Sequence, residues 1–82
     1  MSRRWLRGVV EGADRGPIAG AYVVVVDASV PLPEIALVTD AQGGFVINLP
    51  EGTFRLRADV GGRSGEVGVA VPGDETVRIT VS

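Results

Sequence analysis

The 82-residue sequence contains no cysteine and no histidine, and all eight of its basic residues are arginine. Without these residue types the chain cannot form a disulfide, a cysteine or histidine zinc site, a Ser-His-Asp or Cys-His nucleophilic centre, a lysine Schiff base or a lysine isopeptide crosslink. We therefore expect no catalytic residues, no metal site and no cofactor. The sequence predicts a protein that is not an enzyme.

The sequence also has no excess of positive charge, because its eight basic residues are outnumbered by ten acidic ones. The formal net charge is −2 at pH 7, whereas a general nucleic-acid binder needs a surplus of Lys and Arg to displace counterions from phosphates. Arg3, Arg4 and Arg7 form a local cluster, but Glu11 and Asp14 follow at once. We interpret this cluster as a solvated strand end and expect no nucleic-acid partner.

Long hydrophobic runs are missing as well. No apolar stretch reaches the 18 or so residues that a membrane-spanning helix needs, so we expect no membrane partner. The segment GVVEGADRGP, which follows the first arginines, lacks the apolar run of about 7–15 residues that marks a signal peptide. These absences predict a cytoplasmic location, and export by a route without a signal peptide stays open.

The residues that are present favour an all-β domain. Twelve glycines and five prolines fall at short intervals and leave no room for a helical stripe. Between them lie seven β-rich runs: Trp5–Glu11, Ala21–Asp27, Ile35–Thr39, Phe45–Leu49, Thr53–Ala58, Glu66–Val71 and Thr76–Val81. This spacing predicts one domain over residues 1–82, a seven-stranded antiparallel two-sheet Greek-key sandwich.

Alternation along these runs predicts the core. The residues expected to face inward are Leu6, Val10, Ala21, Val23, Val25, Phe45, Ile47, Leu49, Phe54, Leu56, Ala58, Val67, Val69, Val71, Val77, Ile79 and Val81. Arg55, Arg57, Arg78 and Thr80 then point to water, as half-buried strands require. A chain this short needs nearly all its large apolar residues for the core.

Two turns have recognisable chemistry. In TDAQGGF, the Asp40 side chain can accept hydrogen bonds from backbone amides two residues on, and Gly43 can take a positive φ. In LPEGTF, Pro50 ends a strand and Gly52 reverses the chain. We interpret these residues as structural, and Asp40 and Glu51 as a turn cap and a solvated side chain rather than an acid/base pair.

The segments GPIAGAYVVV, TDAQGGFVINLP and EGTFRLRA, in that order, resemble the carboxypeptidase regulatory-like domain family. The matching positions, which lie between Leu6 and Ala58, are Gly8, Val10, Pro17, Gly20, Ala21, Asp40, Gly43, Phe45, Leu49, Pro50, Gly52 and Phe54. The aromatic residue that commonly follows a glycine after the fifth strand in this family is absent, because Gly62 follows Gly61. The resemblance implies a transthyretin-like (prealbumin-like) sandwich and an accessory role in a larger assembly.

One strand has apolar residues on both faces. If Ala21, Val23 and Val25 face the core, their alternate neighbours face outward, and we expect residues on a neighbouring strand to extend this outer face. The predicted interaction surface is Trp5, Val9, Tyr22, Val24, Val26 and Val46. An apolar outer face on so small a protein indicates contact with another surface, although antiparallel strands also tolerate isolated outward valines.

The loop ASVPLPEI gives a second candidate. Pro31, Leu32 and Pro33 form an extended segment that loses little entropy on docking. Alternatively, the prolines guard a sheet edge.

We therefore predict a non-catalytic interaction or structural module that docks on a partner protein or associates with itself as a homo-oligomer. The alternative is a small ligand-binding or carbohydrate-binding module that uses Trp5 and Tyr22.

Overall fold

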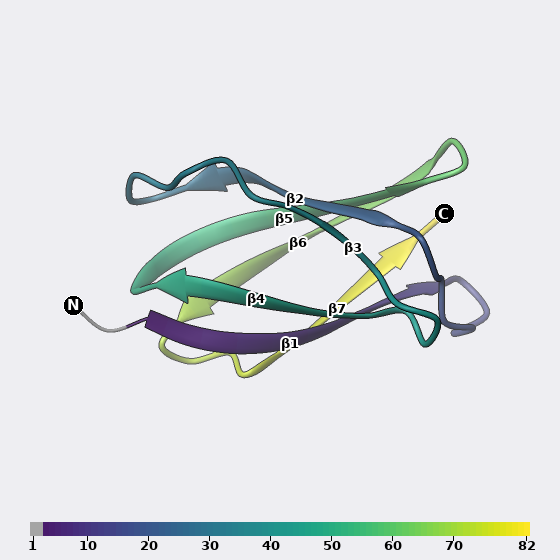
Figure 1. Cartoon of the computed structure of the whole chain (residues 1–82), viewed down its shortest axis with the longest axis horizontal. Coiled ribbons are helices and arrows are strands. Elements are labelled where there is room, and N and C mark those ends of the chain that lie inside the picture. The colour runs from purple at the N-terminus through teal and green to yellow at the C-terminus, as the bar shows by residue number, and fades with distance from the viewer. Residues whose placement is uncertain (1–2) are drawn as a thin grey trace.

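A computed structural model describes residues 3–82, which form seven strands and no helix (Figure 1). The strands are β1 (Arg3–Gly12), β2 (Tyr22–Ala28), β3 (Ala36–Val38), β4 (Gly44–Pro50), β5 (Gly52–Val60), β6 (Arg63–Val71) and β7 (Thr76–Val81). Each corresponds to a predicted run, with differences only at the ends. Within residues 3–82, no helix is long and apolar enough to cross a membrane.

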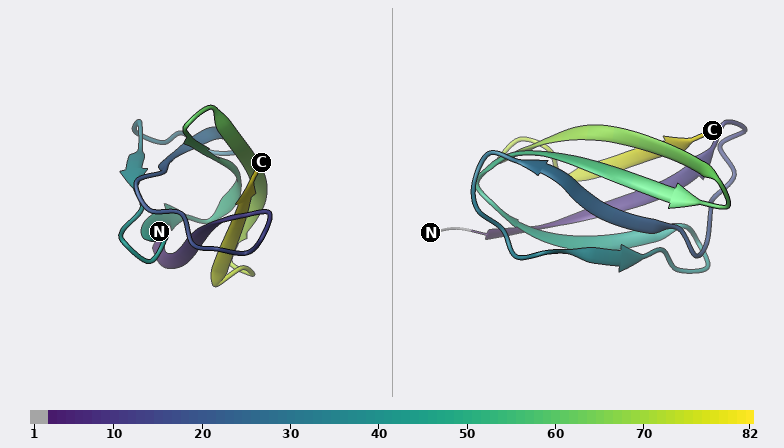
Figure 2. Two further views of the ribbon diagram at one scale, coloured as in Figure 1. Left: turned by 90° about the vertical axis from the view of Figure 1, so that its right-hand side faces the viewer. Right: turned by 90° about the horizontal axis from the view of Figure 1, so that it is seen from above.

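The strands form two sheets, which we name sheet A, in the order β4-β1-β7, and sheet B, in the order β3-β2-β5-β6. Figure 2 shows the two layers from one end and from above. The predicted two-sheet sandwich is confirmed, but the expectation of antiparallel pairing throughout is wrong at one place. Strands β1 and β7 pair in parallel, with Val9 beside Arg78. Parallel neighbours need a long connection, and here almost the whole chain lies between them.

The core lies between the inner faces of the two sheets. Every hydrophobic residue buried in it was predicted to face inward, and the two other predicted core residues, Val25 and Val67, are partly buried against it. The register of β2 against β5 shifts between Val25 and Asp27. This bulge accounts for the incomplete burial of Val25, because a bulge interrupts the strict alternation of faces.

The predicted turn between β3 and β4 is confirmed. The Asp40 carboxylate accepts hydrogen bonds from the backbone N–H groups of Gln42 and Gly44, both at 2.8 Å. Gly43 has a φ of +74°, and Gly52, the first residue of β5, has a φ of +151°. Asp40 and Glu51 flank the two ends of β4 and therefore do not form a pair.

The two long sides of the sandwich differ. On one side β6 packs against β7, where the Ser82 N–H donates to the Ser64 carbonyl oxygen at 3.3 Å. The other side lies between β3 and β4. There the β2–β3 loop (residues 29–35) covers the core with Val30, Leu32 and Ile35, which are partly buried against it.

Candidate interaction surface

The residues of the predicted interaction surface lie on opposite faces of the sandwich. Tyr22 and Val24 are on the outer face of sheet B, and Val26 is exposed at the bulge of the same strand. Trp5, Val9 and Val46 belong to β1 and β4, and thus to sheet A. The expectation that Trp5 and Val9 extend the face of Tyr22 is therefore wrong. Strand β1 pairs with β4 and β7 and has no contact edge with β2.

Strand β3 supplies the neighbours that Tyr22 and Val24 do have. Tyr22 lies opposite Val38, and Val24 lies opposite Ala36. Tyr22 is 57% exposed and Val38 is 59% exposed, so this cross-strand pair presents apolar surface directly to water. We call Tyr22, Val24, Val26, Ala36 and Val38 the apolar strip.

Ala36 and Val38 were absent from the predicted surface. The run IALVT contains the alternation that could have revealed them. In the structure Leu37 is partly buried, whereas Ala36 and Val38 on either side of it are exposed. Alternation does not show which strands pair, so the sequence could not predict that Ala36 and Val38 lie beside Val24 and Tyr22.

Charged residues cover the other half of the same face, over β5 and β6. Arg57 lies 3.1 Å from Asp59 and 3.9 Å from Glu66, and Arg55 lies 3.8 Å from Glu66. These side chains are all at least 40% exposed, and such surface ion pairs contribute little stability. Their effect is to leave this half of the face with balanced charge beside the uncharged apolar strip.

The outer face of sheet A is more mixed. Trp5 is 70% exposed and Val46 is 49% exposed, but Arg7 stands opposite Val46 in the β1–β4 register. Further along β1, Glu11 forms an ion pair with Arg78 at 3.3 Å. Because charged groups alternate with the apolar ones, this face has no continuous apolar surface comparable to the apolar strip.

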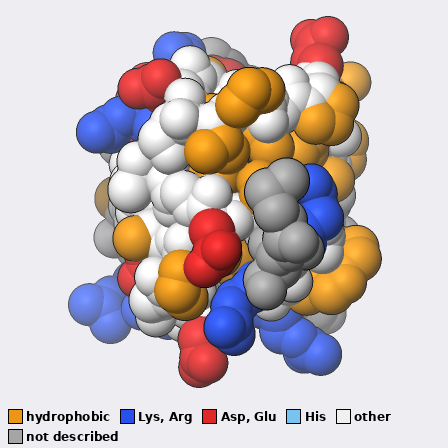
Figure 3. All heavy atoms as spheres, turned by 90° about the vertical axis from the view of Figure 1, so that its left-hand side faces the viewer, with side chains coloured by type: hydrophobic (Ala, Val, Ile, Leu, Met, Phe, Trp, Pro, Cys, Tyr) orange, Lys and Arg blue, Asp and Glu red, His pale blue; other side chains and the backbone are white. Residues whose placement is uncertain are grey.

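The predicted docking loop divides into two parts. Pro31 and Pro33 are exposed, whereas Leu32 is partly buried and packs against the core. Leu32 therefore serves the fold, and the prolines form the outer surface of the loop. Figure 3 views the end of the molecule where this loop lies and shows hydrophobic side chains gathered toward its upper right.

A comparison with protein-family models matches residues 6–82 to the carboxypeptidase regulatory-like domain. The chain belongs to this family. The match includes the last two strands, beyond the segments in which the resemblance was visible. The family is one of non-catalytic accessory domains with a transthyretin-like fold. No curated protein matches the chain.

The packing explains one motif of this carboxypeptidase regulatory-like domain. Gly8 lies opposite Phe45 in the β1–β4 register, and a Cβ atom at Gly8 would lie 2.0 Å from the Phe45 ring. The glycine is thus needed so that the ring can lie flat against the β1 backbone. The motif residues build the core rather than a reactive site.

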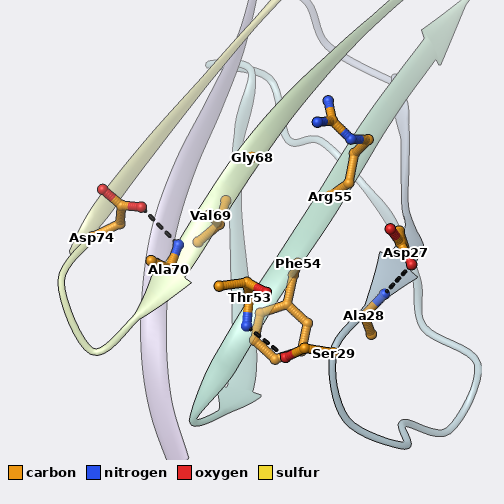
Figure 4. A pocket seen from close by; sticks show the side chains of 10 residues that line it. All are labelled: Asp27, Ala28, Ser29, Thr53, Phe54, Arg55, Gly68, Val69, Ala70 and Asp74. Atoms are coloured by element: carbon orange, nitrogen blue, oxygen red, sulfur yellow. Dashed lines mark hydrogen bonds between the residues drawn. The ribbon is translucent and has the colours of Figure 1, made fainter.

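A hollow of about 450 Å³ lies on sheet B, lined mainly by residues of β2, β5 and β6. It forms where Gly68 and Ala70 of β6 offer little side chain, and Asp27 and Asp74 stand at its two sides (Figure 4). Both carboxylates accept hydrogen bonds from nearby backbone N–H groups, those of Ala28 at 3.0 Å and Ala70 at 2.8 Å. These acids therefore act as caps of local backbone, and residues 3–82 hold no group of three or more potential metal ligands.

Proposed function

We propose that this domain is a protein-interaction module that docks on a partner protein through the apolar strip. The observation that carries the proposal is the Tyr22–Val38 pair, in which two apolar side chains lie side by side, each more than half exposed. Exposed apolar area of this kind is costly to leave in water and is typical of contact surfaces. The balanced ion pairs next to it supply a polar rim, as interfaces commonly have.

The small-ligand or carbohydrate alternative is less well supported. Sugar stacking needs aromatic side chains that share one platform, but Trp5 is on sheet A and Tyr22 is on sheet B. The hollow between Asp27 and Asp74 has one aromatic residue in its lining, Phe54, and this residue is only 4% exposed, so it offers almost no surface on which a sugar could stack. We therefore retain the protein-docking function as the conclusion.

The test is the substitution Val24→Asp. Val24 lies on the outer face between Ala36 and Arg57, so a carboxylate there can hydrate and the sandwich should stay folded. Docking should be lost, because the substitution places a charge in a desolvated contact. The measurements are capture of a partner and mass in solution, with circular dichroism to confirm folding. The matched control is Val46→Asp on the exposed outer face of sheet A, where Arg7 lies opposite the new carboxylate.

Partner capture that survives Val24→Asp and is lost with Val46→Asp would refute the choice of face. A wild-type mass of two or more copies that becomes monomeric with Val24→Asp would show that the docked partner is a second copy.

A further inference from the structure

The sandwich has four edge strands, two on each long side of the molecule, and the two sides differ in how far these edges are covered. Strands β4 and β7 are the edges of sheet A, and β3 and β6 are the edges of sheet B. The β6 and β7 edges lie together, joined by the bond between Ser82 and Ser64. Strands β6 and β7 cover each other's edges, since a Cβ atom at Gly65 of β6 would lie 1.9 Å from the Thr80 carbonyl oxygen of β7. The uncovered edges are therefore those of β3 and β4.

Both ends of the β4 edge are occupied by groups of the chain itself. At one end, Asp40 accepts a hydrogen bond from the N–H of Gly44 through its side chain and donates its own N–H to the Gly44 carbonyl oxygen at 2.9 Å. At the other end, the Arg3 guanidinium donates to the Asn48 carbonyl oxygen at 3.1 Å, and Pro50 has no N–H to offer. Proteins block edge strands against pairing with such devices.

The edge of β3 is short, but within residues 3–82 no other group bonds to it, and Pro31 and Pro33 lie before the strand rather than in it. Thr39 donates its N–H to the Ala21 carbonyl at 3.0 Å and accepts from the Gly20 N–H at 3.1 Å, so its backbone faces β2. Successive residues of an edge strand point their backbone groups to opposite sides. The N–H and C=O groups of Ala36 and Val38 therefore point away from β2, and no loop or side chain in the described part of the chain bonds to them.

The side chains next to this edge define what an added strand would meet. Two cross-strand rows of the apolar strip, Tyr22 with Val38 and Val24 with Ala36, end at the β3 edge. An added strand continues both rows, so its outward residues are best apolar and occur at alternate positions. The four unpaired backbone groups of Ala36 and Val38 supply the hydrogen bonds.

The charges at the two ends of β3 further restrict the added strand. Exposed Glu34 lies two residues before Ala36, and exposed Asp40 lies two residues after Val38. A second copy, paired antiparallel with Ala36 opposite its Val38, would bring Glu34 opposite its Asp40. Like charges in opposite positions are destabilising, whereas basic residues at both ends of the added strand would be attracted.

We propose that β3 accepts an extended segment of the partner protein as a fifth strand of sheet B, and that this segment has alternating apolar residues between basic ends. The inference rests on the proposed docking function and names its mode and the chemistry of its partner. Strand addition of this kind draws affinity from main-chain hydrogen bonds and specificity from alternate side chains.

The probe is the synthetic peptide Arg-Thr-Val-Thr-Val-Thr-Arg, in which the two valines lie opposite Val38 and Ala36 when the two arginines lie opposite Asp40 and Glu34. Titration into the whole domain, followed by NMR, should shift the amide signals of Ala36 and Val38 and slow the exchange of their protons. A peptide with glutamates in place of the arginines should bind at least tenfold more weakly.

The substitution Val38→Pro removes an N–H that faces the edge and leaves the bonds to β2 intact, because proline is accepted at such edge positions. It should weaken peptide binding at least tenfold. Val46→Pro is the matched control, since the N–H of Val46 faces the free edge of β4 as that of Gly44 does, and it should leave binding unchanged. Should Val38→Pro fail to fold, the slowed amide exchange in the wild-type domain remains the decisive measurement.

Two results would overturn the inference. In the first, the peptide shifts Tyr22 and Val24 without slowing the amides of Ala36 and Val38, which means docking on the face without strand addition and leaves the proposed function intact. In the second, the wild-type domain dimerises with these amides protected, so that a second copy occupies the edge. Failure of the proposed function itself is a separate result, namely partner capture that is insensitive to Val24→Asp.

Discussion

Phe54 shows at the scale of one residue how much of the fold depends on few large side chains. It is 4% exposed in the core, and truncation of such a ring leaves a cavity that the surroundings fill only in part. We expect Phe54→Ala to lower the free energy of unfolding by about 3–5 kcal/mol, measured by urea denaturation. Thr53→Ala, at the exposed neighbouring position, should change it by less than about 0.5 kcal/mol. Equal effects of both substitutions would contradict the assignment of faces in β5.

Gly43 is restricted both by its backbone conformation and by its surroundings. Its φ is +74°, and a Cβ atom there would lie 2.7 Å from the Val10 carbonyl oxygen. Gly43→Val should therefore destabilise the domain by more than about 1 kcal/mol, seen as a lower thermal midpoint. The same substitution at Gly68, where no atom lies within 4 Å of the added Cβ, is the control and should leave the midpoint nearly unchanged. A normal midpoint for Gly43→Val would show that the turn relaxes to another conformation.

Among the elements, the connection from β3 to β4 is closed by backbone bonds and by the side chain of Asp40. Two backbone N–H groups donate to the Asp40 carboxylate, and both lose their partner in Asp40→Ala. We expect a loss of about 1–3 kcal/mol in the free energy of unfolding. Glu51→Ala, at an exposed position, should cost less than about 0.5 kcal/mol. If urea denaturation gives the two variants the same stability, the Asp40 bonds are not what closes this turn.

The strands also show what alternation can and cannot predict. The period of two places every buried hydrophobic residue on its correct face, because each strand has one face in a common core. It does not say which strands are neighbours, since pairing joins residues far apart in the sequence. For that reason the inward residues were predicted correctly, whereas Trp5 was assigned to the side of Tyr22 and Val38 was left out. The parallel pairing of β7 with β1 was missed for the same reason.

At the scale of the whole molecule, the two sheets share one core and should unfold together. Fully buried Leu56 belongs to sheet B, and its truncation in Leu56→Ala should cost about 2–5 kcal/mol. That is a large part of the roughly 4–12 kcal/mol expected for a chain of this length. The single tryptophan, Trp5, reports on sheet A, and the single tyrosine, Tyr22, reports on sheet B.

Urea titrations of Leu56→Ala that follow the NMR signals of both rings should therefore show the midpoint falling by the same amount at Trp5 and at Tyr22, because an all-or-none transition has one midpoint for every probe. Thr80→Ala, an exposed substitution in sheet A, is the control and should move neither. A midpoint that falls at Tyr22 alone would mean that sheet A keeps its structure without sheet B. That result would contradict the shared core, because the inner face of sheet A would then be exposed to water at the positions of Leu6 and Ile79, which the folded domain buries almost completely.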